Sequence, residues 1–129
     1  VLKNIYATLV GIAEGIGMNG NFSGYLVSKS IQEMVKISLA LCGEKETALG
    51  TAGVGDLIAT SFSENSKNRS SGIEIAKSNP IPKSEGIVSL PLINKKLGKD
   101  AKDFKLLSAL TDIIENKKDP KTELMDLLS

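Results

Sequence analysis

The apolar positions near the start of the chain repeat with the period of an α-helix. Leu2, Ile5, Leu9, Ile12 and Ile16 are separated by three or four residues, which places them on one helical face. Glycine and asparagine become frequent at residues 15–21 and predict the end of this helix. The pattern therefore predicts an amphipathic first helix.

A second stripe on the same helix consists of small residues, Ala7, Gly11 and Gly15. Glycine inside a helix costs about 1 kcal/mol relative to alanine. Two glycines on one face indicate that the backbone of another element packs closely against them.

The same helical period continues along the chain. We expect a second helix that begins near Asn21 or Ser23, ends at Gly43 and buries Val27, Ile31, Met34, Val35, Ser38, Leu41 and Cys42. Its Lys29 and Glu33, four residues apart, are interpreted as a weak surface ion pair. Further helices are expected over residues 44–49, 68–77 and 86–97, around Phe104, Leu107, Leu110 and Ile114, and from an Asp119-Pro120 cap to Leu128.

No stretch alternates apolar and polar residues as a half-buried strand does. We therefore predict an all-α fold of six to eight helices. Pro91 is expected either to kink its helix or to set the first turn of that helix.

Composition narrows the function classes. The 129 residues suit one domain, and 41% hydrophobic with 24% charged residues is typical of a folded protein. A net charge of +1 argues against a nucleic-acid binder. We expect no membrane span and, since no signal peptide is visible, a cytoplasmic location. The start at Val1 without Met suggests a piece of a longer protein.

The chain has no His and a single Cys. These counts exclude His-based zinc sites, Ser-His-Asp and Cys-His catalysis and an intrachain disulfide, and we expect no metal site. A general base must then be Lys, Asp, Glu or Tyr.

Three segments carry residues suited to chemistry. Lys3-Asn4 precedes the small-residue stripe, so a lysine could exchange a proton with a ligand there, although an ordinary solvated lysine fits too. Asp56 and Thr60 follow a glycine-rich run and share a helical face, or Asp56 simply caps a helix. Ser66-Lys67-Asn68-Arg69 precedes a helix and suits an anion, or forms a basic surface turn.

Taken in order, these motifs resemble the C-terminal, substrate-binding domain of NAD(P)-dependent glycerol-3-phosphate dehydrogenase. The resemblance covers nearly the whole chain. It is carried by Leu2-Lys3-Asn4, Gly11-Ile-Ala-Glu-Gly15-Ile-Gly17, Ile31-Gln-Glu33-Met34, Thr51-Ala-Gly53-Val-Gly55-Asp56-Leu57, Ser66-Lys67-Asn68-Arg69, Glu85-Gly86 and Lys118-Asp119-Pro120.

The resemblance implies an all-α domain over residues 1–129, of the type found at the C-terminus of 6-phosphogluconate dehydrogenase. It implies an enzyme that interconverts dihydroxyacetone phosphate and sn-glycerol 3-phosphate. The cofactor, NAD or NADP, would be bound mainly by an N-terminal Rossmann domain that is absent from this chain. The expected partners are that Rossmann domain and the two substrates, dihydroxyacetone phosphate and sn-glycerol 3-phosphate.

The resemblance also implies roles for individual residues. Lys3 matches the catalytic lysine, which protonates the substrate's C2 oxygen during reduction and also contacts the substrate. The substrate-binding positions are Asn4, Asp56, Thr60, Ser66, Lys67 and Asn68, and the positions that touch the cofactor are Lys67, Lys83 and Glu85.

Some features depart from the family pattern. Lys67 stands where the family usually has Arg, which keeps the charge but loses the bidentate fork. The loop from Arg69 to Glu85 is several residues shorter than usual, and Ser89-Leu90-Pro91 falls where the family has an uninterrupted helix.

One alternative function is a stand-alone helical module for binding or dimerisation, without catalysis. Another is a dehydrogenase of a different hydroxy acid. The domain could also pair with a second copy through an apolar surface.

Overall fold

A computed structural model describes residues 2–18, 20–42, 67–77 and 84–127, except for the side chains of Ser38 and Cys42. The predicted all-α class is confirmed, and these residues contain no strand. The elements are α1 (Leu2–Gly15), α2 (Gly20–Cys42), α5 (Lys67–Ala76), α6 (Glu85–Leu97), the 3₁₀ helix η1 (Gly98–Asp103), α7 (Lys105–Glu115) and α8 (Pro120–Asp126). The helix expected over residues 44–49 lies outside the described part.

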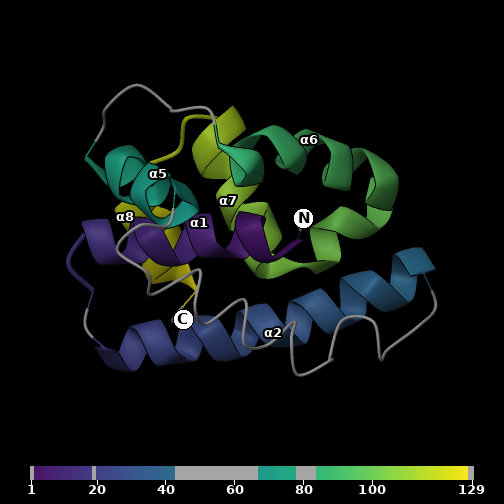
Figure 1. The fold of residues 1–129 in the computed structure, drawn as a ribbon, viewed down its shortest axis with the longest axis horizontal. Coiled ribbons are helices and arrows are strands. Elements are labelled where there is room, and N and C mark those ends of the chain that lie inside the picture. Colours follow the sequence, from purple (N-terminus) through teal and green to yellow (C-terminus); the bar gives the residue numbers. More distant parts are fainter. Residues whose placement is uncertain (1, 19, 43–66, 78–83, 128–129) are drawn as a thin grey trace.

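Helix α1 lies at the centre of the fold. Figure 1 shows it between α2 on one side and α5 and α6 on the other, and α7 also contacts it. Every residue from Asn4 to Ala13 is buried. The prediction of an amphipathic helix was therefore wrong, although Ile5, Leu9 and Ile12 of its apolar stripe are buried as expected and Leu2 and Ile16 are partly buried. Neighbouring helices cover the opposite face too, which sequence periodicity could not indicate.

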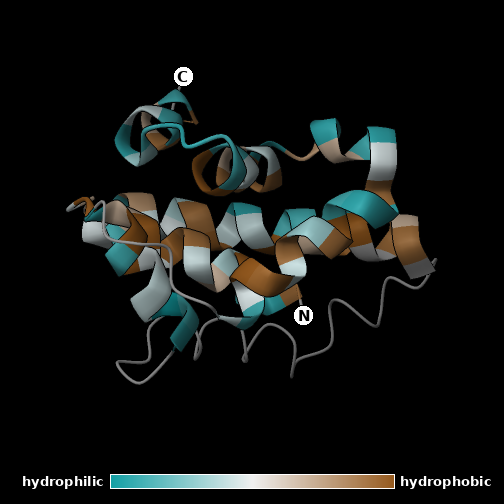
Figure 2. Cartoon of the chain, turned by 90° about the horizontal axis from the view of Figure 1, so that it is seen from above, coloured by the Kyte–Doolittle hydropathy of each residue, from teal (hydrophilic) through white to brown (hydrophobic). Residues whose placement is uncertain are grey.

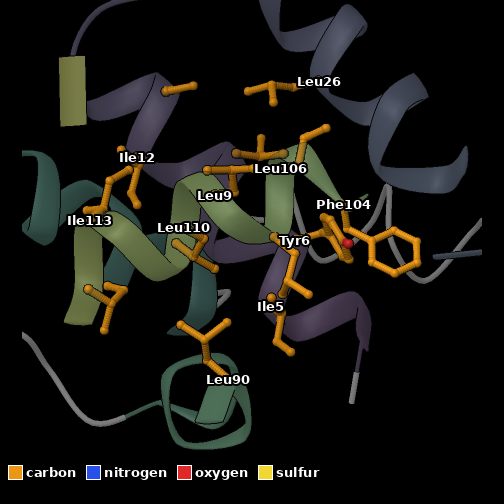
Figure 3. Close-up of a cluster of buried hydrophobic side chains, with 14 of the residues drawn as sticks. Ile5, Tyr6, Leu9, Ile12, Leu26, Leu90, Phe104, Leu106, Leu110 and Ile113 are labelled. Atoms are coloured by element: carbon orange, nitrogen blue, oxygen red, sulfur yellow. The ribbon is translucent and has the colours of Figure 1, made fainter. Parts of the chain in front are cut away.

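The core gathers around α1. In Figure 3, Ile5 and Leu9 lie among Leu90 of α6 and Leu106 and Leu110 of α7, all of which are buried. Figure 2 shows hydrophobic and hydrophilic residues mixed along most of the outer helices, as expected where one face meets this core and the other meets solvent.

The small-residue stripe of α1 does meet another backbone, that of α5. A Cβ atom at Gly11 would overlap the carbonyl oxygen of Arg69, and one at Gly15 would lie 3.0 Å from the carbonyl oxygen of Ile73. From the other side, a Cβ at Gly72 would overlap the carbonyl oxygen of Thr8. The glycines thus set how closely α1 and α5 approach.

This contact predicts opposite effects for alanine at two helical glycines. Gly11→Ala gains helix propensity but forces the two backbones apart, and we expect a net loss of about 2 kcal/mol in unfolding free energy. Gly24→Ala in α2 is the matched control, because none of the described residues comes within 4 Å of the position that its added methyl group would take. We expect this control to stabilise the protein by about 0.5–1 kcal/mol. Urea denaturation measures both, and a stabilising Gly11→Ala would contradict the close packing.

The buried face of α2 differs from the one predicted. Among its described side chains, the buried ones are Phe22, Leu26, Ser30, Glu33, Met34 and Ile37. Val27, Ile31 and Val35 are only partly buried, and Leu41 is exposed. The face is rotated by about one residue, and two polar residues that the prediction left out, Ser30 and Glu33, point inward.

Glu33 is the main surprise of α2. The interpretation of Lys29 and Glu33 as a surface ion pair was wrong, because Glu33 is buried. Its carboxylate accepts hydrogen bonds from backbone amides at the start of α7. One oxygen accepts hydrogen bonds from the Tyr6 hydroxyl at 2.9 Å and the Leu107 amide at 3.3 Å. The other accepts from the Leu106 amide at 2.8 Å. A carboxylate there also faces the positive end of the α7 dipole.

The same contacts predict a loss of stability in alkali. Burial, the Glu33 charge and the hydrogen bond to Glu33 raise the pKa of Tyr6 well above its ordinary value of 10.0. A raised folded-state pKa stabilises the protein below about pH 10, and this contribution is lost as pH rises towards the folded-state pKa. We expect a slope of about 1.4 kcal/mol per pH unit from this group. Unfolding midpoints at pH 9 to 11 should show it, Tyr6→Phe should remove it, and Tyr25→Phe should retain it.

Helices α6 and α8 test the sequence predictions for Pro91 and for the Asp119-Pro120 cap. Helix α6 runs through Pro91, which lies in its interior and does not set its first turn. The Asp119-Pro120 cap is confirmed, since the Asp119 side chain accepts a hydrogen bond from the Thr122 amide at 3.0 Å. The last helix ends at Asp126, two residues before the predicted Leu128.

Candidate active site

The first turn of α1 carries two of the residues singled out by the sequence. Lys3 is partly buried, and Asn4 is buried. The Asn4 carbonyl oxygen accepts a hydrogen bond from the Thr8 hydroxyl at 2.9 Å, four residues further along the helix. The α1 N-terminus therefore presents a lysine beside a buried amide side chain, at the positive end of the helix dipole.

The Asn4 side chain joins α1 to both α5 and α6. Its amide nitrogen donates to a carboxylate oxygen of Glu85 at 2.6 Å. Its amide oxygen accepts from the Asn68 amide nitrogen at 3.1 Å. The Asn68 oxygen in turn accepts from the backbone amide of Gly86 at 3.0 Å. Three residues far apart in the sequence, Asn4, Asn68 and Glu85, thus form one hydrogen-bonded junction.

Gly86 allows this junction to close. A Cβ atom there would lie 2.6 Å from the Thr8 hydroxyl oxygen and would overlap the Asn4 carbonyl. Only a residue without a side chain lets the first turn of α6 approach α1 this closely. The Glu85-Gly86 pair therefore supplies a carboxylate and a close backbone contact at one place.

The N-terminus of α5 lies at the same junction. Lys67 is exposed and Asn68 is buried in the first turn, which contains no acidic residue. The first turn of a helix has backbone N–H groups without helical acceptors, and its dipole favours anions. Arg69 binds α1 instead. Its guanidinium pairs with the Glu14 carboxylate through Nε at 2.7 Å and through a second nitrogen.

The structure brings together part of the set of predicted site residues. Lys3, Asn4, Lys67, Asn68 and Glu85 lie on the first turns of α1, α5 and α6. The other predicted positions, Asp56, Thr60, Ser66 and Lys83, lie outside the described residues.

The described residues hold neither a metal site nor a membrane span. Within residues 2–18, 20–42, 67–77 and 84–127, no group of three or more His, Cys, Asp and Glu side chains could hold a metal ion. In the same part of the chain, none of the helices combines the length and apolar character needed to cross a bilayer.

A separate hollow of about 290 Å³ lies between α2 and the start of α7, away from the junction. Lys29, Lys36 and Lys105 line it together with Glu33 and Asp103. Of the predicted site residues that the structure describes, none lines this hollow. No sequence pattern indicated it, because its walls come from segments about 70 residues apart.

Comparison with known proteins identifies the family. The sequence profile described as "NAD-dependent glycerol-3-phosphate dehydrogenase C-terminus" matches residues 1–125. The glycerol-3-phosphate dehydrogenase [NAD(P)+] of Methylococcus capsulatus is 31% identical over 134 aligned residues, which cover 98% of this chain and 40% of that protein. The chain thus spans about 40% of the length of this curated relative.

Solved structures share the fold. Glycerol-3-phosphate dehydrogenase from Coxiella burnetii superposes with a TM-score of 0.89 at 26% identity, over 99% of this chain and 42% of that one. DsGPDH of Dunaliella salina superposes with a TM-score of 0.80 at 23% identity, over 97% of this chain and 25% of that one. With a profile match over almost every residue, the chain belongs to the family of NAD-dependent glycerol-3-phosphate dehydrogenase C-terminal domains.

Proposed function

We propose that this chain is the substrate-binding and catalytic half of an oxidoreductase that interconverts dihydroxyacetone phosphate and sn-glycerol 3-phosphate with NAD(P)(H). One observation carries the proposal. Asn4, Asn68 and Glu85, each given a ligand-binding role by family resemblance, meet in one hydrogen-bonded junction next to Lys3. Residues without a common role, on three separate helices, would not be expected to contact one another in this way.

Lys3 is the proposed proton donor. A bound nicotinamide would supply the hydride to C2 of the substrate during reduction. The Lys3 ammonium then delivers a proton to the C2 oxygen, which leaves a neutral amine and a secondary alcohol, and oxidation reverses the transfer. The ammonium charge and the positive end of α1 stabilise negative charge as it develops on that oxygen.

The first turn of α5 is the proposed phosphate site. The backbone N–H groups in the first turn of a helix suit phosphate oxygens, and Lys67 adds an exposed positive charge there. Lysine binds phosphate as a point charge and lacks the two-pronged geometry of arginine. Asn68 uses its side-chain oxygen to hold Gly86 and one N–H to hold Asn4. Its remaining N–H can serve the ligand, so Asn68 both binds and orients.

Glu85 and Lys67 fit a dinucleotide, with Lys83 assigned to the same contact by family resemblance. Glu85 is exposed, and only one of its oxygens is used by Asn4. The second oxygen can accept a hydrogen bond from a hydroxyl or carboxamide group, while the Lys67 ammonium suits a phosphate. Most of the contacts with NAD or NADP would come from a Rossmann domain.

An activity assay of the complete native protein tests the proposal. We expect dihydroxyacetone phosphate to drive the oxidation of NADH or NADPH, with kcat/KM at least about 100-fold above that for unphosphorylated dihydroxyacetone. Equal rates with both substrates would favour a dehydrogenase of another hydroxy compound. Binding of glycerol 3-phosphate without turnover by either cofactor would favour the stand-alone module.

A further inference from the structure

The hollow between α2 and the start of α7 is lined by three lysines. Lys29 and Lys36 lie seven residues apart, two turns along one face of α2, and Lys105 is the first residue of α7. Lys36 and Lys105 are exposed, and Lys29 is partly buried. Within the described part of the chain, none of the three ammonium groups has a carboxylate within ion-pair distance. Three cations around one hollow therefore repel one another unless an anion lies between them.

The two carboxylates that also line the hollow do not cancel this charge. Both oxygens of the buried Glu33 are occupied, one by the Leu106 amide at 2.8 Å and the other by the Leu107 amide at 3.3 Å. The positive end of the α7 dipole offsets part of the Glu33 charge. Asp103 is exposed, so water screens it. The hollow keeps an excess of positive charge.

The walls and the size of the hollow favour a small ligand. Phe104 and Leu106, both labelled in Figure 3, are buried and give it an apolar side. The Lys29 ammonium lies 5.8 Å from the centroid of the Tyr25 ring, a cation–π contact that helps to hold it in place. A charged cleft with apolar walls focuses its field on a counter-ion. The volume of about 290 Å³ is just below the range of typical drug-sized sites, about 300–1,000 Å³, and suits a compound of few heavy atoms.

We propose that this hollow binds a small dianion, either free phosphate or a phosphate monoester, between Lys29, Lys36 and Lys105. A phosphate monoester carries a charge of about −1.5 to −2 near neutral pH and three strong acceptor oxygens, one for each ammonium group. A monocarboxylate brings less charge and one acceptor oxygen fewer. The site is separate from the first turns of α1, α5 and α6, and the inference goes beyond the proposed function.

Hydrogen exchange of the complete native protein, followed peptide by peptide, tests this assignment. Exchange is measured with millimolar inorganic phosphate and with sodium chloride at the same ionic strength, which screens the lysines to the same extent. We expect phosphate to slow exchange over residues 25–36 and 103–107, and the slowing to saturate, because a ligand of the folded state stabilises the elements that bind it. Peptides from the first turns of α1, α5 and α6 report separately on the proposed substrate site.

Single substitutions identify the groups that bind. Lys36→Gln and Lys105→Gln each remove one ammonium group, and we expect each to weaken phosphate binding at residues 25–36 and 103–107 by at least about fivefold. Lys105→Arg keeps the charge and should keep the binding. Lys96→Gln on α6 is the matched control, because it removes an exposed lysine that does not line the hollow. It should leave the affinity unchanged.

Glycerol 2-phosphate distinguishes the two sources of the phosphate group. Tighter binding than inorganic phosphate supports a monoester as the ligand, and equal affinity supports recognition of the phosphate group alone. No slowing beyond the chloride reference overturns the proposal, and so does equal slowing in the two Lys→Gln variants. Slow exchange without phosphate that phosphate does not change also overturns it, because another part of the complete protein would then fill the hollow. The measurement needs no turnover, so its failure leaves the proposed function standing.

Discussion

Replacement of Lys3 by alanine in the complete enzyme is expected to lower kcat by about 10²–10⁴-fold, the usual contribution of a positioned proton donor. Alanine also removes the positive charge that stabilises the developing alkoxide. Lys3 lies in the first turn of α1, and its side chain is only partly buried. Its replacement should therefore leave folding intact. Steady-state rates with dihydroxyacetone phosphate, alongside thermal unfolding, measure both effects.

Two further variants sharpen this result. Lys3→Arg keeps the charge, but guanidinium holds its proton too tightly to donate it, so we expect nearly the same loss as for alanine. Lys99→Ala in η1 removes an exposed lysine from a different part of the surface and should leave the rate unchanged. If Lys3→Ala kept more than about a tenth of the activity, the loss would be under 1.4 kcal/mol and the assignment would be wrong.

Helix positions were largely predictable from the sequence, whereas helix environment was not. The stripe from Leu2 to Ile16 located α1, and Asp119-Pro120 located the start of α8. Burial of α1 on all sides depends on α5, α6 and α7, which lie more than 50 residues away. The pattern within one segment cannot indicate how many neighbours that segment acquires. The glycines of α1 were more informative, because a costly residue in a helix needs a packing reason.

The candidate site was predictable only as far as family resemblance and helix-terminus chemistry reach. Each motif by itself fitted an ordinary surface feature. The structure joins Asn4, Asn68 and Glu85 in one junction, while their roles towards substrate and cofactor stay predictions. Asp56, Thr60, Ser66 and Lys83 lie outside the described residues, so their placement stays a prediction as well.

Glu33 was misinterpreted for a physical reason. Its spacing from Lys29 fits a helical surface pair, and an ionised side chain is seldom buried. Its actual partners are the Tyr6 hydroxyl, 27 residues earlier, and the amides of Leu106 and Leu107, 73 and 74 residues later. The charge is tolerated because three donors surround it. A signal in the sequence does exist, since α7 begins after Phe104 without a side-chain cap of its own.

Glu33→Ala should therefore be among the most destabilising single substitutions in this domain. It leaves the Tyr6 hydroxyl and two amides of α7 buried without their acceptor, each at a cost of about 1 kcal/mol or more. We expect a total loss of about 3–4 kcal/mol and a fall in Tm on the order of 10 °C. Hydrogen exchange gives a local readout, because the Leu106 and Leu107 amides should lose protection more than the rest of α7.

Two comparisons separate capping from a general effect of removing a glutamate. Glu33→Gln keeps one acceptor oxygen and the side-chain volume, so it should recover about half of the lost stability. Glu115→Ala, at the exposed end of the same α7, should change stability by less than about 0.5 kcal/mol. A Glu33→Ala loss below about 1 kcal/mol, with the two amides still protected, would mean that water replaces the carboxylate. The contact of α1, α2 and α7 around Glu33 would then be held by apolar packing alone.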